Sequence, residues 1–356
     1  MQATGWQNAR KLLIARLDNA GDVLLTGPAL RAVRNQLPEC HLTLWSSPGG
    51  AAVAGLLPEI DDTLTTRALW QDLGHLPFDP RREQNLLETL SRGHYDGAII
   101  FTSFAQSPHP AAYACYLAGI PRRAGQSKEF AGGVLTHPVT PLPDDVHQVD
   151  RNLHLVRSLG WNAVSHELAV SISDQDRDTL GLLLRIKGIG LGRPFALIHP
   201  GASCPSRRYP LARFAEVGRS LHRGLGWSIV ISGGEREVER AKDLAVAIGP
   251  GAVSLAGETR VGEFAALVER ATVVITNNTF TMHLADAART PEVVLFAGTE
   301  HESQWRPRTT RSRVLRQPTP CQPCYRFECP FGLPCLDIPP RQVAAAVLEL
   351  VGETAQ

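Results

Sequence analysis

Residues 11–36 read KLLIARLDNAGDVLLTGPALRAVRNQ, and their pattern indicates the fold class. It begins with an apolar run, Lys11–Leu17, passes through a short turn that contains Gly21 and Asp22, and continues as an amphipathic segment, Pro28–Gln36. A short apolar run bounded by turn residues is typical of a buried strand, and a proline near the first turn is typical of a helix. The stretch therefore predicts a strand–turn–helix unit of an α/β protein.

The same alternation of apolar runs and amphipathic segments recurs along the chain. Strands are predicted at His41–Trp45, Ala98–Phe101, Phe195–His199, Trp227–Ser232, Ala252–Leu255, Val273–Thr276 and Val293–Phe296. Helices are predicted at Glu83–Leu90, Val149–Leu159, Leu211–His222, Glu235–Ile248, Gly262–Arg270, Thr281–Ala288 and Gln342–Val351. Strands that alternate with helices form parallel sheets covered on both faces.

A polar stretch around residues 171–178 interrupts this alternation, after which the pattern restarts. The chain has 356 residues, whereas single hydrophobic cores stop growing at roughly 250–300 residues. We therefore expect two Rossmann-like, doubly wound parallel-sheet domains, residues 1–172 and 173–356, with a ligand cleft between them. One large α/β sheet is the alternative.

Composition argues against a nucleic-acid-binding protein and against a membrane-spanning one. The 36 Lys and Arg residues nearly cancel the 35 Asp and Glu residues, so there is no dense basic surface for a nucleic acid. No stretch approaches the roughly 20 apolar residues that a membrane-spanning helix needs. Residues 1–10 are polar and lack the apolar segment of a signal peptide. These features predict a cytoplasmic protein with no nucleic-acid partner.

The turn after the first strand carries one glycine, Gly21, where a dinucleotide-binding fold would have G-x-G-x-x-G. The acidic Asp22 beside it would repel a pyrophosphate, which argues against an NAD-dependent oxidoreductase. A carboxylate at a helix N-terminus is stabilised by the helix dipole. Asp22 is therefore interpreted either as a capping residue or as a general base.

Two loops that follow strands of the second half contain candidate binding residues. The loop 199–210 carries Ser203 and Arg207, and it is either an anion cradle or a solvated surface loop. The next loop carries Gly233, which allows a ligand to approach the backbone or simply makes a turn. Glu237 follows, either as an acceptor for ribose hydroxyls or as a partner of a helix dipole.

A third loop, 276–283, carries Asn278, Thr279 and His283 between an apolar strand and a helix. His283 either contacts a phosphate or is a histidine whose hydrogen bonds are satisfied within the protein. All three loops follow predicted strands of one sheet. Because the carboxyl ends of parallel strands share one edge, the three loops together predict a binding site.

Four of the cysteines lie in one short segment: Cys321, Cys324, Cys329 and Cys335. Four thiols this close in a reducing compartment indicate a metal site, reduced thiols or disulfides. The spacing does not distinguish Zn from Fe, because both metals accept thiolate ligands.

Three segments, in this order, resemble glycosyltransferase family 9, the ADP-heptose:lipopolysaccharide heptosyltransferases. They are the turn Gly21-Asp22-Val23 that continues to Thr26, Pro28, Ala29 and Leu30, the HPGAS…RRYP segment of residues 199–210, and VITNNTFTMHLA of residues 274–285. The resemblance extends from about Leu12 to Val351. It implies the GT-B fold, with an N-terminal acceptor domain (1–172) and a C-terminal nucleotide-sugar donor domain (173–356).

The resemblance also implies roles for individual residues. Asp22 matches the catalytic base that deprotonates an acceptor hydroxyl. The residues that it implies for the donor and nucleotide are Ser203, Arg207, Gly233, Glu237, Asn278, Thr279 and His283. For the acceptor we expect Gly21, with Arg122, Arg123 and Lys128 either meeting acidic groups of a lipid-linked sugar or remaining solvated. Asn278 and Phe280 stand where the family usually has Asp and Gly.

The implied activity is an inverting, metal-independent transfer of a sugar, a heptose from ADP-heptose, to a lipopolysaccharide-core or related glycan acceptor. The alternatives are a UDP- or GDP-sugar donor, or a nucleotide-sugar-binding protein of degenerate activity. No cofactor is required for catalysis. A similar cysteine cluster accompanies some members of the family and implies a structural Zn or Fe. The expected partners are a nucleotide sugar and a lipid-linked or glycan acceptor, with peripheral contact at the inner face of the inner membrane.

Overall fold

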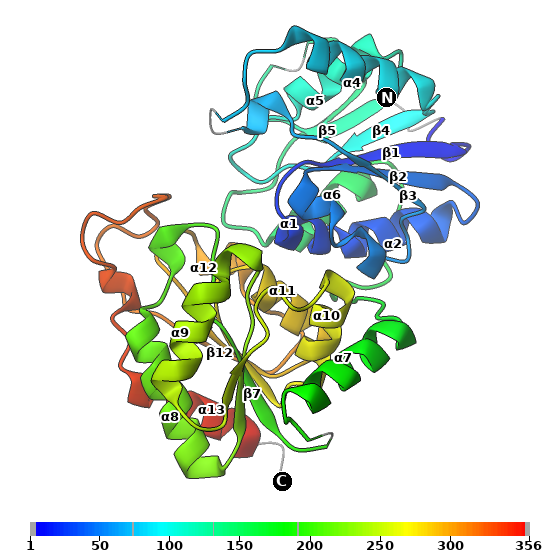
Figure 1. Ribbon diagram of the computed structural model, residues 1–356. Helices are drawn as coiled ribbons and strands as arrows, with labels where there is room; N and C mark the ends of the chain where they lie inside the picture. The colour runs from blue at the N-terminus through cyan, green and yellow to red at the C-terminus, as the bar shows by residue number, and fades with distance from the viewer. Residues whose placement is uncertain (1–4, 73–74, 131, 191, 353–356) are drawn as a thin grey trace. The chain divides into compact units, whose positions relative to one another are not determined.

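The computed structural model describes residues 5–72, 75–130, 132–190 and 192–352 (Figure 1). The chain folds into two compact units, Met1–Ser171 and Ile172–Gln356, so the border lies one residue before the expected one. Within the described residues, each unit contains one six-stranded parallel sheet. The prediction of two doubly wound α/β domains is therefore confirmed, and the alternative of one large sheet is wrong.

The sheet of the first unit has the strand order β3-β2-β1-β4-β5-β6, and its pairings are parallel. Its strands are β1 (Lys11–Arg16), β2 (His41–Ser46), β3 (Asp62–Thr65), β4 (Gly97–Ile100), β5 (Arg123–Gln126) and β6 (His137–Val139). The strand order reverses between β1 and β4. In open α/β sheets, ligands bind beyond the carboxyl ends of the strands at such a reversal.

Helices cover both faces of this sheet: α1 (Ala20–Leu24), α2 (Gly27–Gln36), α3 (Pro48–Ala51), α4 (Pro80–Arg92), α5 (His109–Leu117) and α6 (Gln148–Ser158). The α2–α6 pair and the α4–α5 pair lie on opposite faces (Figure 1). Leu13 and Ala15 of β1 pack with Leu90 of α4, while Leu12 and Ile14 are fully buried as well. The strand is thus buried on both faces, as its apolar run predicts.

The second sheet has the order β12-β11-β10-β7-β8-β9 and is parallel. Its strands are β7 (Phe195–His199), β8 (Ser228–Ile231), β9 (Ala252–Ser254), β10 (Val273–Asn277), β11 (Glu292–Leu295) and β12 (Ser312–Leu315). The reversal lies between β7 and β10, so the loops that follow these two strands are the expected ligand loops.

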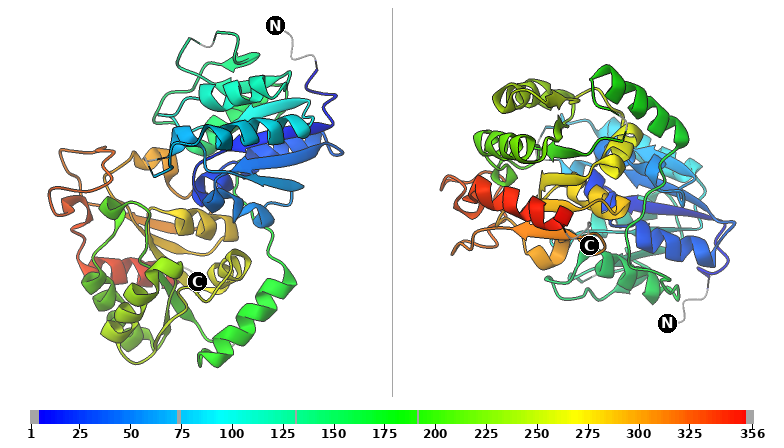
Figure 2. Two further views of the ribbon diagram at one scale, coloured as in Figure 1. Left: turned by 45° about the horizontal axis from the view of Figure 1, so that its top comes forward. Right: turned by 90° about the horizontal axis from the view of Figure 1, so that it is seen from below.

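The helices of the second unit are α7 (Asp174–Ile186), α8 (Leu211–Leu225), α9 (Val238–Ile248), α10 (Val261–Arg270), α11 (Phe280–Ala288), α12 (Glu302–Trp305) and α13 (Pro340–Gly352). One face carries α8, α9 and α13, and the other carries α7, α10 and α11 (Figures 1 and 2). In α8 the buried Phe214, Val217 and Leu221 form one apolar stripe. The helix ends at Gly226 in the left-handed conformation (φ 68°), which glycine adopts without strain.

In the part of the chain described here, no helix is long and apolar enough to cross a membrane.

Candidate active site

The carboxylate of Asp22 lies beyond the carboxyl end of β1 and accepts two hydrogen bonds. Asp22, in the first turn of α1, accepts a hydrogen bond from Arg16 Nη2 at 2.9 Å through Oδ1. Its Oδ2 accepts a hydrogen bond from the backbone N–H of Asn19 at 3.2 Å, as in a capping box. The side chain is 16% exposed. Asp22 therefore caps the helix and also presents a carboxylate at the sheet edge, so the two interpretations are compatible.

Arg16 and Asp18 belong to this site, although sequence reasoning did not single them out. Arg16 is completely buried, its Nε lies 3.1 Å from Asp18 Oδ2, and its Nη2 also donates to Ser103 Oγ at 3.0 Å. Burial raises the pKa of the Asp18 carboxyl, Arg16 opposes this rise, and the charge of Asp22 adds to it. The signal was an arginine that ends an otherwise apolar strand.

The residues expected at the acceptor are placed differently. Gly21 is buried in α1, next to Asp22. Arg123 is the first residue of β5 and Arg122 precedes it, so both lie at the amino edge of the sheet, opposite Asp22. Their guanidinium groups donate to nearby backbone carbonyls. The structure does not bring these two arginines to the site, because the amino and carboxyl ends of parallel strands lie on opposite edges.

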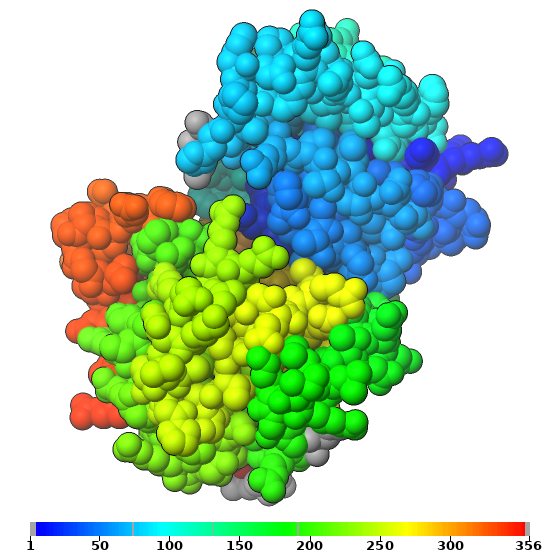
Figure 3. Space-filling model, in the orientation of Figure 1, coloured from blue at the N-terminus to red at the C-terminus, as the bar shows by residue number. Residues whose placement is uncertain are grey.

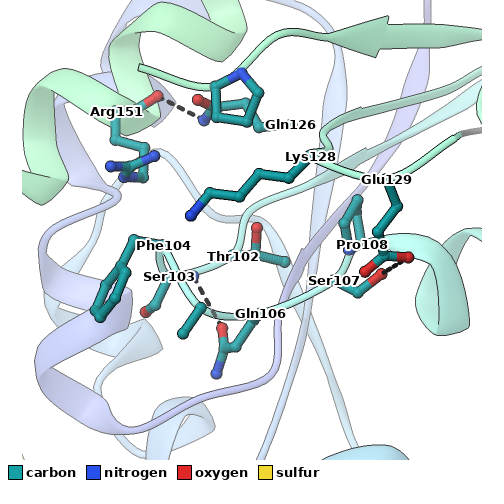
Figure 4. A pocket seen from close by; sticks show the side chains of 12 residues that line it. Thr102, Ser103, Phe104, Gln106, Ser107, Pro108, Gln126, Lys128, Glu129 and Arg151 are labelled. Atoms are coloured by element: carbon teal, nitrogen blue, oxygen red, sulfur yellow. Dashed lines mark hydrogen bonds between the residues drawn. The ribbon is translucent and has the colours of Figure 1, made fainter. Parts of the chain in front are cut away.

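A cavity of about 210 Å³ lies among the segments that follow β4 and β5 (Figure 4). Residues 102–108 form much of its lining, together with Gln126, Lys128, Glu129, Pro141 and Arg151. Ser103 lines the cavity and also accepts the hydrogen bond from Arg16. The cavity is therefore next to the group that holds Asp22.

The lining combines positive charge with an unused hydrogen-bond acceptor. Lys128 Nζ pairs with Asp144 Oδ1 at 2.5 Å, and its side chain extends across the cavity toward Phe104 (Figure 4). Arg151 is 2% exposed and donates to the carbonyl of residue 143. Gln126 Oε1 is buried and has no hydrogen-bond partner among the described residues. A ligand that carries hydroxyl groups and negative charge would satisfy both features.

In the second unit, Asn277 organises the loop that follows β7. Its Nδ2 donates to the carbonyl oxygens of Pro200 and Gly201 at 3.0 and 3.2 Å, and its Oδ1 accepts from the backbone N–H of Tyr209 at 3.0 Å. The side chain is fully buried at the end of β10. Asn277 thus fixes the loop at both ends, which sequence reasoning did not identify.

Arg207 and Ser203 lie on the loop that Asn277 organises. Arg207 pairs with Glu300 through Nη2 and Oε1 at 2.7 Å, and its Nε donates to Thr299 Oγ1 at 3.1 Å. Its side chain is 25% exposed, and Ser203 is exposed. Arg207 is therefore partly accessible to solvent, and an acid already contacts it.

Glu237 joins the loops that follow β7 and β8. Its Oε2 accepts from the backbone N–H of Gly234 at 2.9 Å. A Cβ on Gly201 would lie only 2.1 Å from Glu237 Oε1, and a Cβ on Gly233 would lie 3.0 Å from Glu237 Cβ. A side chain at Gly201 would therefore displace the Glu237 carboxylate, and one at Gly233 would press against Glu237 Cβ. Burial lowers the pKa of the neighbouring His199, and the Glu237 carboxylate opposes that shift.

The N-terminus of α11 follows β10 and offers hydrogen-bond donors. Thr279 is the N-cap in an extended conformation and its side chain does not cap the helix. Asn278 Oδ1 accepts from the backbone N–H of Ala297 at 3.1 Å. Its Nδ2 and the hydroxyl of Thr281 are buried without a hydrogen-bond partner in the described structure. The N–H groups that a helix leaves unpaired at its first turn, beside an unpartnered amide, are suited to an anion.

Aromatic rings flank this helix end. Phe280 begins α11, and its ring centroid lies 6.2 Å from that of Phe264, which in turn lies 5.8 Å from the His199 ring. His283 is 7% exposed, with its ring 6.4 Å from the Trp305 ring. Phe280 is thus part of an aromatic row at the carboxyl edge of the second sheet.

The cysteine loop, residues 316–338, carries the four clustered cysteines as free thiols. Burial raises the pKa of Cys335, and the charges of Cys329 and Cys324 add to this rise, so these three thiols are neighbours. Within the described residues, however, no group of three or more His, Cys, Asp or Glu side chains is arranged to hold a metal ion. The thiols as they stand do not fit a metal.

The cysteine loop contacts one candidate donor loop, residues 199–210, and the segment that follows β11. The backbone N–H of Ser206 donates to Phe327 O at 3.1 Å. Cys324 and Tyr325 donate to the carbonyl oxygens of Gly298 and Thr299 at 3.0 and 2.9 Å. Figure 3 shows this loop, in orange, on the surface of the second unit. It supports the segments that hold Arg207 and its neighbour Thr299.

The sequence profile of the family described as glycosyltransferase family 9 (heptosyltransferase) matches residues 84–333. Lipopolysaccharide heptosyltransferase 2 of Escherichia coli K12 is 22% identical over 324 residues, which cover 86% of this chain and 88% of that protein.

Two solved structures share the fold. The glycosyl transferase family 9 protein of Veillonella parvula superposes with a TM-score of 0.79 at 21% identity, covering 97% of both chains. The ADP-heptose lps heptosyltransferase II of E. coli superposes with a TM-score of 0.76 at 20% identity, and the match covers 97% of this chain and 100% of that chain.

Proposed function

This chain belongs to glycosyltransferase family 9, and we propose that it transfers a heptose from ADP-heptose to a hydroxyl of a lipopolysaccharide-core or related glycan acceptor. The observation that carries this proposal is the carboxylate of Asp22, held by the buried Arg16 at the sheet edge and beside a polar cavity. The similar E. coli proteins are named for lipopolysaccharide and ADP-heptose, which supports the same donor and acceptor class here.

The first unit binds the acceptor in this proposal. Asp22 removes the proton of the attacking hydroxyl, which is the role of a general base. The acceptor occupies the cavity lined by Lys128 and Arg151, whose positive charges attract acidic groups of the glycan. Gln126 Oε1 accepts a hydrogen bond from a ring hydroxyl. A lipid-linked acceptor brings the protein to the cytoplasmic, inner face of the inner membrane.

The second unit binds the nucleotide sugar. The diphosphate lies against the N-terminus of α11, where Asn278 Nδ2 and the free N–H groups donate to its oxygens. Arg207 adds positive charge, and Thr279 and His283 line the same helix end. Glu237, next to Gly233 and Gly201, accepts hydrogen bonds from the ribose.

The reaction is a single displacement that inverts the anomeric carbon. The hydroxyl oxygen forms a bond to that carbon while the bond to the diphosphate breaks, and the bonding electron pair leaves with the diphosphate. The hydroxyl proton goes to Asp22. Because Arg207 and the N–H groups of α11 stabilise the departing charge, the proposed transfer needs no metal.

The cysteine loop has no part in this chemistry. The described thiols do not fit a metal as they stand. Elemental analysis of purified protein, together with thiol titration, distinguishes a structural Zn or Fe from reduced thiols and from disulfides.

Transfer is tested by incubating the protein with ADP-heptose and heptose-free core glycan, and by measuring both ADP release and the mass of the product. Addition of one heptose residue supports the proposal. Equal transfer from a UDP- or GDP-sugar would retain a glycosyltransferase but reject the donor. Binding of nucleotide without any transfer would identify a binding protein of degenerate activity.

A further inference from the structure

Arg16 carries a positive charge although none of its surface is exposed to water, so its burial has a large desolvation cost. A buried guanidinium is tolerated when carboxylates and hydrogen bonds compensate it. Here one guanidinium lies between two carboxylates, those of Asp22 at 2.9 Å and Asp18 at 3.1 Å, and its Nη2 also donates to Ser103 Oγ at 3.0 Å.

Asp18 and Ser103, which contact Arg16, are both hydrogen-bonded to Gln106. Asp18 is 8% exposed and accepts from Gln106 Nε2 at 2.5 Å, and Gln106 Oε1 accepts from the backbone N–H of Ser103 at 2.8 Å. Asp18, Gln106 and Ser103 thus form a closed frame around one side of the guanidinium. Asp22 lies on the other side and is the more exposed of the two carboxylates, at 16% against 5% for the side chains.

We propose that Arg16 is a positioning residue for the transfer: framed by Asp18 and Ser103, it orients the carboxylate of Asp22 toward the acceptor hydroxyl. This inference rests on the proposed function and names the residue that sets the geometry of its base. The planar guanidinium donates hydrogen bonds to Asp22 and Ser103 and forms an ion pair with Asp18 at the same time, whereas a lysine ammonium cannot reproduce that fork.

Asp18 has a second effect in this arrangement. When Asp22 takes the proton, its negative charge is lost, and Arg16 would be left as a buried, uncompensated cation. Asp18 remains beside Arg16 and supplies the counter-charge at that moment. Burial raises the pKa of Asp18 and the Arg16 charge opposes that rise, while protonation of Asp22 removes the neighbouring negative charge that adds to it.

The test compares Arg16→Met and Arg16→Lys with Arg34→Met in the full-length protein. Arg34 is a matched control because it also serves backbone carbonyls and one carboxylate, those of Cys40, Glu59 and Asp61, but at the amino edge of the same sheet. A misplaced catalytic group costs on the order of 100-fold in rate. We expect Arg16→Met to lower kcat by about that factor with the KM for the nucleotide sugar unchanged, Arg16→Lys to recover part of the loss, and Arg34→Met to keep kcat.

Chemical rescue separates positioning from folding. In Arg16→Ala, added guanidinium should raise kcat while the same ionic strength of NaCl does not, and Asp18→Asn should lower kcat with Arg16 still present. An Arg16→Met protein that keeps the wild-type kcat, or an equal loss in Arg34→Met, would overturn the inference. A wild-type protein that transfers no sugar contradicts the proposed function instead, and the inference with it.

Discussion

Asp22 combines a structural and a chemical task in one side chain, since it caps α1 and meets the acceptor hydroxyl in the proposed reaction. Its two oxygens have different partners, Arg16 Nη2 and the backbone N–H of Asn19. An asparagine can still accept one hydrogen bond at this position, but it cannot accept a proton at neutral pH. The two tasks can therefore be separated by substitution.

Asp22→Asn is expected to reduce kcat by a factor of roughly 10²–10⁴, the usual contribution of a general base. The thermal unfolding temperature should fall less for Asp22→Asn than for Asp22→Ala, because the amide oxygen can keep the cap while both variants lose the charge that pairs with the buried Arg16. Asp22→Ala should also lose kcat, and about 1 kcal/mol more stability than the Asn variant, the typical value of a cap. Turnover of the Asn variant within a few-fold of the wild type would reject Asp22 as the base.

Glu292 is a buried acid that is not among the proposed catalytic and binding residues. It is completely buried at the start of β11, and neither carboxylate oxygen has a hydrogen-bond partner within the described chain. Burial raises its pKa well above the ordinary value, and the charge of Asp286 raises it further. In the folded state it therefore holds its proton at a pH where the unfolded chain has lost it.

Because the pKa of Glu292 differs between the folded and unfolded states, the free energy of unfolding depends on pH. Above the unfolded pKa the folded state binds more protons, so stability falls as pH rises toward the folded pKa. Glu292→Gln should remove this fall, and its stability advantage over the wild type should grow by up to about 1.4 kcal/mol per pH unit between the two pKa values. Urea unfolding from pH 5 to 8 measures this difference in the free energy of unfolding, with Glu349→Gln as an exposed control. If the free energies of the Glu292→Gln variant and the wild type changed in parallel with pH, the prediction would be contradicted.

At the scale of elements, the donor loops are organised by contacts between segments far apart in sequence. Asn277 ties β10 to the loop after β7, and the cysteine loop supports both the turn before Arg207 and the segment around Thr299. Arg207 is paired with Glu300 across these loops. A diphosphate that binds Arg207 must therefore compete with a carboxylate.

Glu300→Gln is expected to tighten ADP binding about two- to five-fold, because a partly exposed ion pair of up to about 1 kcal/mol no longer opposes the ligand. Arg207→Gln should weaken binding and reduce its salt dependence. Calorimetric titration at two salt concentrations measures both, with Arg213→Gln on α8 as the control. Weaker ADP binding by the Glu300 variant would show instead that this acid contacts the nucleotide favourably.

The elements that the sequence predicted are those with a strong local pattern. The apolar runs of β1, β2, β4, β7, β8, β10 and β11 are buried on both sides and are recognisable at once. The strands β3, β5, β6 and β12 were not predicted, because sequences such as Arg123–Gln126 carry no apolar run and become strands by pairing with a neighbour. Helix α7 lies in the polar stretch near residue 175 and is held by a few buried leucines and the Ser173 cap.

For the whole molecule, the division into two units predicts a local response to nucleotide. ADP should protect the first turn of α11 and the loops after β7 and β8 from hydrogen exchange, and leave the β1–α1 turn unchanged. Among ADP, UDP, GDP and NAD, ADP should give the largest thermal shift, since a ligand at 100 times its Kd adds about 2.7 kcal/mol of stability. Protection confined to the first unit would contradict the assignment of the donor to the second.

The fold class, and the sheet edge that carries the candidate site, follow from the sequence alone. Apolar runs alternating with amphipathic segments can bury their surface only as parallel sheets covered by helices, and the carboxyl ends of parallel strands share one edge. Gly21, Asp22 and the three loops of the second unit were located on that basis.

Tertiary structure alone decided which charges meet. Arg16 donates a hydrogen bond to Ser103, 87 residues away in the sequence, and Arg207 forms an ion pair with Glu300. Arg123 lies at the amino edge of its sheet, opposite Asp22. Charge pairing depends on distance and burial in space. A one-dimensional pattern specifies which face of an element is apolar, but not which distant side chain compensates a buried charge.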